Sequence, residues 1–154
     1  MPDNATLDLT TGMTLEGWVN PSATGTAWRT LIMKQNTADL VYALYANVNT
    51  NRPSARAFTS AEFNTDGTAA VPTSSWTFLT ETYDGANVRL YVNGTQASAK
   101  AVTGSMPNST GPLKIGGNAL WAEWFSGLID NVRVYNRALS AAEIASDMNT
   151  RVTP

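Results

Sequence analysis

The stretch FSGLIDNVRVYNRALSAAEI, residues 125–144, joins an apolar strand pattern to the start of a helix. Alternation predicts that one face of this strand consists of Leu128, Asp130, Val132 and Val134. The opposite face then consists of Ile129, Asn131, Arg133 and Tyr135. Asp130 is therefore expected on an otherwise apolar face, where a carboxylate needs a partner.

The same stretch contains a signal for the start of a helix. Ser140 stands three residues before Glu143, the spacing of a capping box in which each side chain satisfies a free backbone N–H group. We therefore predict that the strand ends near Tyr135 and that a short helix occupies residues 140–148.

The rest of the chain consists of short apolar or alternating runs separated by turn residues. The pairs Asp84-Gly85 and Asn93-Gly94 are typical of tight hairpins. The runs that we interpret as strands are 14–19, 30–34, 39–47, 54–59, 76–83, 87–93, 96–99, 113–115 and 123–135, the last being the longest. The sequence thus predicts an all-β, two-sheet antiparallel sandwich with one short C-terminal helix.

Composition favours one ordinary folded domain, because 43% of the 154 residues are hydrophobic and 14% are charged. A net charge of −2 without clusters of Lys or Arg argues against nucleic acid as a partner. No apolar run is long enough to cross a membrane, so membrane insertion is not expected, and Pro2 follows Met1 directly without the pattern of a signal peptide. The many Thr, Ser, Asn and Gly residues favour a secreted or cell-surface bacterial module.

The absence of cysteine and histidine removes thiolate and Ser-His nucleophiles and the usual zinc sites. Any metal ion would have to be bound by oxygen atoms. Paired acids on one strand, as glycoside hydrolysis would need, are also missing from the pattern. The sequence therefore predicts that the protein is not an enzyme.

Four stretches, in order and at matching spacings, resemble the laminin G-like, concanavalin A-like jelly rolls, and among them the bacterial group related to pentraxins. They are TLEGWVNP (14–21), WTFLTETYDGANVRLYVNGTQ (76–96), LKIGGN (113–118) and the stretch 125–144. The resemblance covers almost the whole of residues 1–154. It implies a single jelly-roll domain with a concave sheet crossed by loops and a non-catalytic role.

The chain differs from the family at its N-terminal end. Domains of this family carry a further strand before the segment that residues 2–9 match. The absent strand is expected to pair with residues 124–135, leaving an open groove lined by Leu128, Val132 and Val134. Unpaired edges of this kind favour association. We therefore expect a tag, a partner chain or a neighbouring copy to donate a strand there.

Asp130 is the position at which the resemblance implies a calcium ion, because similar jelly rolls hold one with oxygen ligands at the edge of the sandwich. Asp3 and Asp8 are further available acids, whereas Asp84 is interpreted as a turn residue. The alternative for Asp130 is a carboxylate that accepts hydrogen bonds from backbone N–H groups and a nearby Arg or Tyr.

Aromatic side chains indicate a carbohydrate site, because sugar rings stack on them while hydroxyl groups hydrogen-bond to flanking polar residues. We predict a cleft formed by two loops, with Trp121 and Trp28 as stacking residues. The flanking ligand-binding residues are Asn118, Glu123, Arg56 and Tyr45. Trp18, Trp76 and Trp124 are expected to cover the core or a sheet instead.

The predicted function is that of a non-catalytic carbohydrate-binding module of a larger secreted or surface bacterial protein, with a glycan or polysaccharide as its partner. The alternative is a module for protein–protein interaction or adhesion that uses the same loops or the open groove. A purely structural domain is the third possibility.

Overall fold

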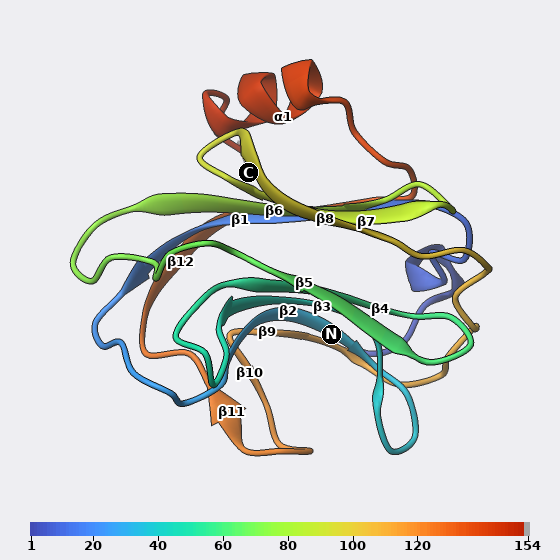
Figure 1. Cartoon of the computed structure of the whole chain (residues 1–154). Helices are drawn as coiled ribbons and strands as arrows, with labels where there is room; N and C mark the ends of the chain where they lie inside the picture. Colours follow the sequence, from blue (N-terminus) through green and yellow to red (C-terminus); the bar gives the residue numbers. More distant parts are fainter. Residues whose placement is uncertain (153–154) are drawn as a thin grey trace.

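The computed structural model describes residues 1–152 and forms two five-stranded antiparallel sheets packed face to face (Figure 1). Sheet A has the order β12 (Gly127–Tyr135), β1 (Met13–Pro21), β6 (Thr77–Tyr83), β7 (Asn87–Val92) and β8 (Thr95–Ala101). Sheet B has the order β5 (Glu62–Asp66), β4 (Ser54–Phe58), β3 (Leu40–Asn47), β2 (Arg29–Gln35) and β9 (Leu113–Ile115). The predicted all-β sandwich is confirmed.

Three smaller elements complete the described structure. A short hairpin, β10 (Gly117–Asn118) and β11 (Glu123–Trp124), projects from the sheet B side, and the helix α1 (Ala141–Met148) lies against the outer face of sheet A (Figure 1). A 3-10 turn, η1 (Ala5–Leu7), precedes β1. The hairpin and α1 therefore mark opposite outer faces of the sandwich.

The main core lies between the sheets and is built by the alternate residues that face inward. Leu15 and Leu79 come from sheet A, Leu31 and Leu44 from sheet B, and all four are fully buried. The hairpin β6–β7 turns at Asp84, whose Oδ1 accepts hydrogen bonds from the backbone N–H groups of Ala86 and Asn87. The turn role expected for Asp84 is thereby confirmed.

The simple alternation predicted for residues 128–135 is wrong, because β12 contains a bulge. Glu16 of β1 pairs with Arg133, but Trp18 pairs with Asp130, so β12 holds one extra residue there. Asn131 occupies the bulge with a left-handed backbone (φ 49°). The phase therefore changes: Val132 and Val134 pack against the core together with Ile129, whereas Leu128 and Asp130 lie on the outer face.

Because of the bulge, the predicted lining of the groove is also wrong. Leu128 is 61% exposed on the outer face, so it cannot line a groove with Val132 and Val134, which pack against the core. Within the part of the chain that the structure describes, β12 has only β1 as a hydrogen-bonded neighbour. Strand donation to this edge remains a prediction.

Two further predictions about strands are wrong. The long strand expected over 123–135 is broken, because Phe125 hydrogen-bonds to the Gly116 carbonyl in the hairpin while Ser126 accepts from the Ser22 amide. β5 was not predicted at all. Phe63 is the one apolar residue among its residues EFNTD, which are mostly half-exposed at the edge of sheet B, so no apolar alternation marks them.

The helix begins as predicted. The Ser140 hydroxyl accepts from the Glu143 N–H, and the Glu143 carboxylate accepts from the Ser140 N–H, which forms the complete capping box. Leu139 and Ile144 are buried against Phe78 and Tyr91 of sheet A. This apolar contact fixes α1 on the sheet.

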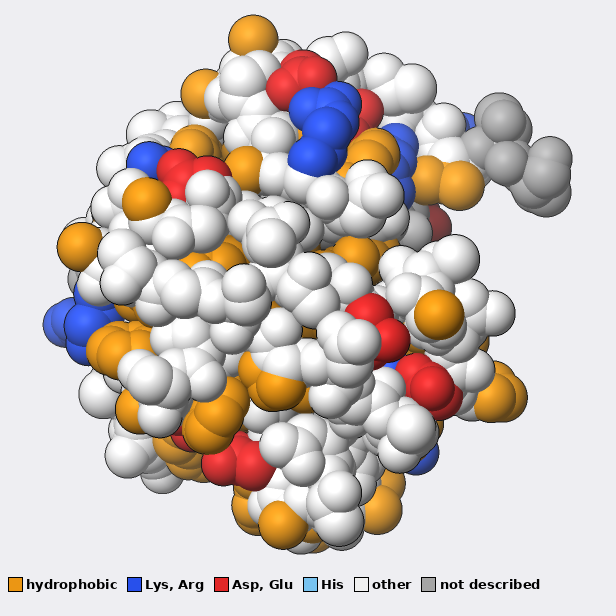
Figure 2. Space-filling view, turned by 90° about the vertical axis from the view of Figure 1, so that its right-hand side faces the viewer, with side chains coloured by type: hydrophobic (Ala, Val, Ile, Leu, Met, Phe, Trp, Pro, Cys, Tyr) orange, Lys and Arg blue, Asp and Glu red, His pale blue; other side chains and the backbone are white. Residues whose placement is uncertain are grey.

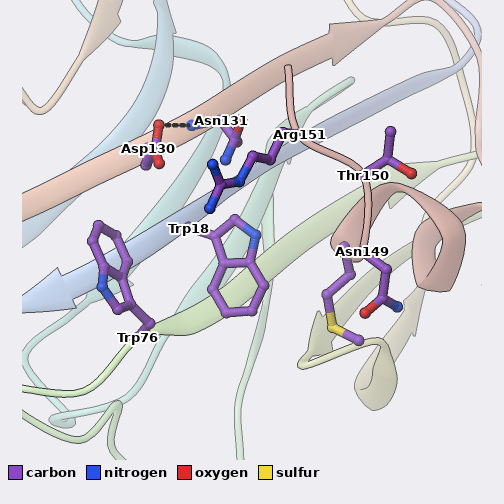
Figure 3. Close-up of a pocket in the computed structure, with 8 residues that line it drawn as sticks. Trp18, Trp76, Asp130, Asn131, Asn149, Thr150 and Arg151 are labelled. Atoms are coloured by element: carbon purple, nitrogen blue, oxygen red, sulfur yellow. Dashed lines mark hydrogen bonds between the residues drawn. The ribbon is translucent and has the colours of Figure 1, made fainter. Parts of the chain in front are cut away.

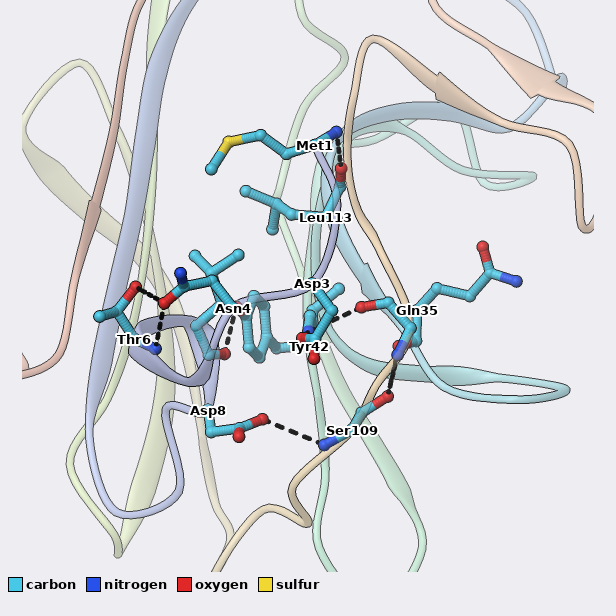
Figure 4. A network of polar contacts seen from close by, with 12 residues as sticks. Met1, Asp3, Asn4, Thr6, Asp8, Gln35, Tyr42, Ser109 and Leu113 are labelled. Carbon is cyan, nitrogen blue, oxygen red and sulfur yellow. Dashed lines mark hydrogen bonds and ion pairs between the residues drawn. The ribbon is translucent and has the colours of Figure 1, made fainter.

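The N-terminal segment is tied to sheet B by polar contacts (Figure 4). The Met1 ammonium donates to the Leu113 carbonyl at 2.8 Å, and the Ser109 N–H donates to Asp8 at 3.0 Å. Lys34, which is fully buried, pairs with Asp3. The two acids considered as extra metal ligands therefore serve to attach this segment.

On the face shown in Figure 2, Lys and Arg side chains lie in separate small groups among many uncharged polar side chains. Over residues 1–152, no helix is long and apolar enough to span a membrane.

Candidate functional site

A pocket of about 270 Å³ lies on the outer face of sheet B, beside the β10–β11 hairpin. We call it the aromatic pocket. Its polar and aromatic walls are formed by Trp28, Tyr45, Arg56, Glu62, Trp121 and Glu123. The structure thus brings together every residue of the predicted glycan site except Asn118, and it adds Glu62 and Leu40, which the sequence analysis missed.

Arg56 and two aromatic rings form the floor of the aromatic pocket. The rings of Trp28 and Tyr45 meet edge to face, with centroids 5.2 Å apart and planes at 84°. The Arg56 guanidinium lies 4.5 Å from the centre of the Trp28 ring and 5.6 Å from that of Tyr45, and it also pairs with Glu62. The floor is therefore a rigid surface of aromatic rings and one cation.

Asn118 lies behind the pocket rather than in its wall. It is buried, its Nδ2 donates to the Thr30 hydroxyl at 2.9 Å and to Glu123 at 2.8 Å, and its Oδ1 accepts from the Trp121 N–H at 2.9 Å. Its amide is thus fully used within the protein. We conclude that Asn118 positions Trp121 and Glu123, a role that depends on tertiary contacts and carries no signal in the sequence.

Glu123 is held by one of its two carboxylate oxygens. Its Oε2 accepts hydrogen bonds from Tyr45 at 3.0 Å, Asn118 at 2.8 Å and Thr30 at 3.3 Å. Burial, reinforced by the Glu123 charge, raises the pKa of the Tyr45 phenol far above its usual value. Tyr45 therefore remains a donor, and Oε1 of Glu123 makes no hydrogen bond to residues 1–152, so it is available to a ligand.

A glycine makes the hairpin at the pocket possible. Gly117 has φ +150°, and a Cβ atom there would lie 2.4 Å from the Trp124 ring. Only glycine therefore lets β10 pass Trp124 so closely. The hairpin in turn places Trp121 at its tip, 40% exposed over the pocket.

The tryptophan predictions are only partly right. Trp76 and Trp124, expected to be covering residues, are exposed by 42% and 57%. Trp18 does cover sheet A, packing on Phe78 at 5.2 Å between ring centroids. Trp28 is half-buried because Arg56 lies over its ring.

The surroundings of Asp130 do not by themselves form a calcium site. The carboxylate is exposed on the outer face of sheet A, and its Oδ1 accepts from the N–H of Asn131 at 2.8 Å. No group of three or more acidic, His or Cys side chains gathers within residues 1–152 as a metal site would require. Calcium prefers six to eight oxygen ligands, so its binding at Asp130 remains a prediction that these residues do not support.

Two carboxylates, Glu62 and Glu123, do line the aromatic pocket. A glycosidase needs one carboxyl group kept protonated by apolar surroundings. Glu123 instead accepts three hydrogen bonds, and Glu62 faces the Arg56 guanidinium. The arrangement is suited to accepting hydrogen bonds from a ligand.

Comparisons with known proteins extend these observations. Pappalysin-1 of Mus musculus is 40% identical over 81 residues, which make up 49% of this chain but only 5% of pappalysin-1. Domain 4 of AbnA, a GH43 extracellular arabinanase from Geobacillus stearothermophilus whose structure contains arabinotriose, superposes with a TM-score of 0.79 at 22% identity over 96% of this chain and 70% of that chain.

Two further structures share the fold at low sequence identity. A putative carbohydrate binding protein from Bacteroides ovatus gives a TM-score of 0.73 at 21% identity, covering 94% of this chain and 42% of that chain. A SAP-like pentraxin from Limulus polyphemus gives 0.63 at 15% identity, covering 88% and 69%. The resemblance to laminin G-like and pentraxin-related jelly rolls is thereby confirmed at the level of the fold.

The family comparison covers nearly the whole chain. The laminin G model described as the concanavalin A-like lectin/glucanases superfamily matches residues 1–145. The protein therefore belongs to the concanavalin A-like lectin/glucanases superfamily.

Proposed function

We propose that this protein is a non-catalytic carbohydrate-binding module of a larger secreted or surface protein, and that the aromatic pocket is its binding site. The observation that carries the proposal is the convergence of Trp28, Trp121, Arg56 and Glu123 in one open pocket. The arabinotriose complex of the AbnA domain and the name of the Bacteroides protein support this class of ligand.

Binding would combine stacking with hydrogen bonds. The exposed Trp121 ring offers a face to the C–H groups of a sugar, and the Arg56 guanidinium, which lines the pocket, offers N–H donors. The free Oε1 of Glu123 accepts from sugar hydroxyl groups. Because the pocket is small and open, we expect modest affinity.

Isothermal titration with arabinotriose, followed by a panel of neutral oligosaccharides, tests this proposal. Trp121→Ala should weaken binding at least about tenfold, which corresponds to about 1.4 kcal/mol. Trp124→Ala is the matched control, because Trp124 belongs to the same hairpin and is exposed but does not line the pocket. Equal affinity of Trp121→Ala and the unaltered protein would show that sugars do not bind here.

A second candidate function is protein interaction through β12. Its outer edge is free within residues 1–152, and Val132 and Val134 beside it are only partly buried. A second copy that adds its own β12 would cover this edge. The bulge at Asn131 restricts the ladder to short segments, so such pairing should be weak. Self-association of the protein in solution tests it.

A further inference from the structure

A second pocket, on the outer face of sheet A, contains two tryptophans, and the predicted glycan site does not include it. Its volume is about 420 Å³, within the range of small-ligand sites. We call it the tryptophan pocket; Trp18, Trp76, Asp130, Asn131, Thr150 and Arg151 line it (Figure 3). We propose that it is a second carbohydrate-binding site, specific for neutral sugars, which makes the molecule bivalent.

The apolar wall of the tryptophan pocket is fixed from below. Trp18 packs against Phe78, which is fully buried beneath α1, so the indole of Trp18 is held in place. Trp76 directly precedes β6, the strand that pairs with β1, and is 42% exposed. Figure 3 shows both indoles on the same side of the pocket. Two indoles at one opening suit the apolar C–H faces of a sugar ring.

The polar wall results from the β12 bulge. Asp130 pairs with Trp18 across the β1–β12 ladder, and the extra residue at Asn131 turns its carboxylate outward. Its Oδ1 accepts from the Asn131 N–H, whereas Oδ2 has no hydrogen bond to residues 1–152. The bulge thus places a free acceptor beside the indole of Trp18.

Donors come from the segment that follows α1. The Asn131 Oδ1 accepts from the Val152 N–H at 2.8 Å, which fixes this segment against β12 and leaves the Asn131 Nδ2 pointing away from that bond. Arg151 forms no ion pair with any other residue in 1–152. Its side chain lines the pocket together with Asp130 and Trp18 (Figure 3). The pocket therefore combines one carboxylate acceptor with amide and guanidinium donors.

This combination selects the class of ligand. Vicinal hydroxyl groups act both as donors to a carboxylate and as acceptors from amide and guanidinium groups. One negative and one positive side chain offset each other, so the pocket has no net charge that would attract an anionic sugar. A neutral oligosaccharide fits both the indole faces and the polar groups.

The two pockets lie on opposite sides of the sandwich. Trp18 belongs to the cluster between sheet A and α1, whereas Trp28 and Tyr45 belong to a cluster on the outer face of sheet B. The main core separates these clusters. One molecule can therefore hold two glycan chains, although the inference for the tryptophan pocket does not depend on binding at the aromatic pocket.

The experiment follows each indole separately. The protein has five tryptophans, so the five indole N–H signals in a ¹H–¹⁵N spectrum can be assigned by single substitutions and titrated with arabinotriose, maltotriose, cellotriose and xylotriose. We expect at least one of these sugars to shift the signals of Trp18 and Trp76 saturably. Trp76→Ala and Asp130→Ala should each weaken the shift of Trp18 about tenfold or more, with Trp124→Ala as the control.

The outcomes separate the two sites. Shifts of Trp18 and Trp76 that persist in Trp121→Ala support the tryptophan pocket even if the aromatic pocket binds nothing. The inference is overturned if none of the four sugars shifts these two signals, if the Trp18 shift is unaffected by Trp76→Ala, or if trigalacturonate binds there more tightly than the neutral sugars. A molecule that binds two glycan chains should cross-link a soluble polysaccharide of the same sugar and make the solution turbid. Trp76→Ala should abolish this turbidity.

Discussion

At the scale of single residues, the most unusual group is a carboxyl inside the core. Glu81 on β6 is fully buried, and neither of its oxygens makes a hydrogen bond of good geometry within residues 1–152, although the backbone N–H of Arg56 lies near the carboxyl group. Burial raises its pKa well above the usual value. Glu81 therefore keeps its proton to a higher pH in the folded protein than in the unfolded chain.

This difference predicts how stability depends on pH. Above the ordinary pKa of 4.5, the unfolded state has released the proton that the folded state keeps, so the free energy of unfolding should fall as pH rises, by at most about 1.4 kcal/mol per pH unit for one group. Glu81→Gln should be less sensitive to pH. Urea unfolding from about pH 5 to about pH 9 measures the slope.

Glu16 provides the control for this prediction. Burial, reinforced by Asp147, raises the pKa of Glu16 to about 7, and the Arg133 guanidinium 3.3 Å away opposes that rise. Its contribution to the slope should end near pH 7, so Glu16→Gln should flatten only the lower part of the curve. A slope between about pH 5 and about pH 9 that is identical in the unaltered protein and Glu81→Gln would contradict the assignment to Glu81.

At the scale of secondary-structure elements, features that depend on neighbouring residues could be predicted from the sequence. Features that depend on pairing with a distant strand could not. The capping box at Ser140 and the turn at Asp84 depend on residues within three positions, so the sequence shows them directly. The bulge at Asn131 depends on pairing with β1, more than 100 residues away, and the alternating pattern alone wrongly placed Leu128 and Asp130 on the same face as Val132 and Val134.

The candidate site shows the same division. Trp121 and Trp28 could be proposed from the sequence because aromatic residues in loops are typical of binding sites. The function of Asn118 depends on three tertiary hydrogen bonds, and the tryptophan pocket depends on the cross-strand pair of Trp18 and Asp130. The spacing of residues along the chain predicts neither arrangement.

The bulge itself gives a prediction for β12. Asn131 has φ 49°, which asparagine tolerates better than alanine, so Asn131→Ala should lower the free energy of unfolding by about 1 kcal/mol. Asn131→Gly should cost less, because glycine adopts this conformation freely. Urea unfolding compares both with Asn136→Ala, an exposed asparagine outside the bulge. Equal stability of Asn131→Ala and the unaltered protein would mean that this conformation is not strained.

At the scale of the whole molecule, the fold presents three separate surfaces. The aromatic pocket lies on the sheet B side, and the tryptophan pocket lies beside α1. The free edge of β12 is one edge of sheet A (Figure 1). Asp130 belongs to β12 and also lines the tryptophan pocket. Assembly through the β12 edge and sugar binding at the tryptophan pocket are therefore expected to influence each other.

Sedimentation velocity over a wide range of protein concentration tests assembly through this edge. If a second copy pairs with β12, a dimer should form as concentration rises, and Leu128→Lys should weaken it, because a charged side chain on an edge strand opposes pairing. Leu128 is 61% exposed, so this change should leave the fold intact, and Ile115→Lys on β9 is the control because Ile115 is also exposed at the edge of sheet B. A monomer at every concentration would rule out self-pairing. A dimer that Ile115→Lys disrupts and Leu128→Lys does not would place the interface on sheet B.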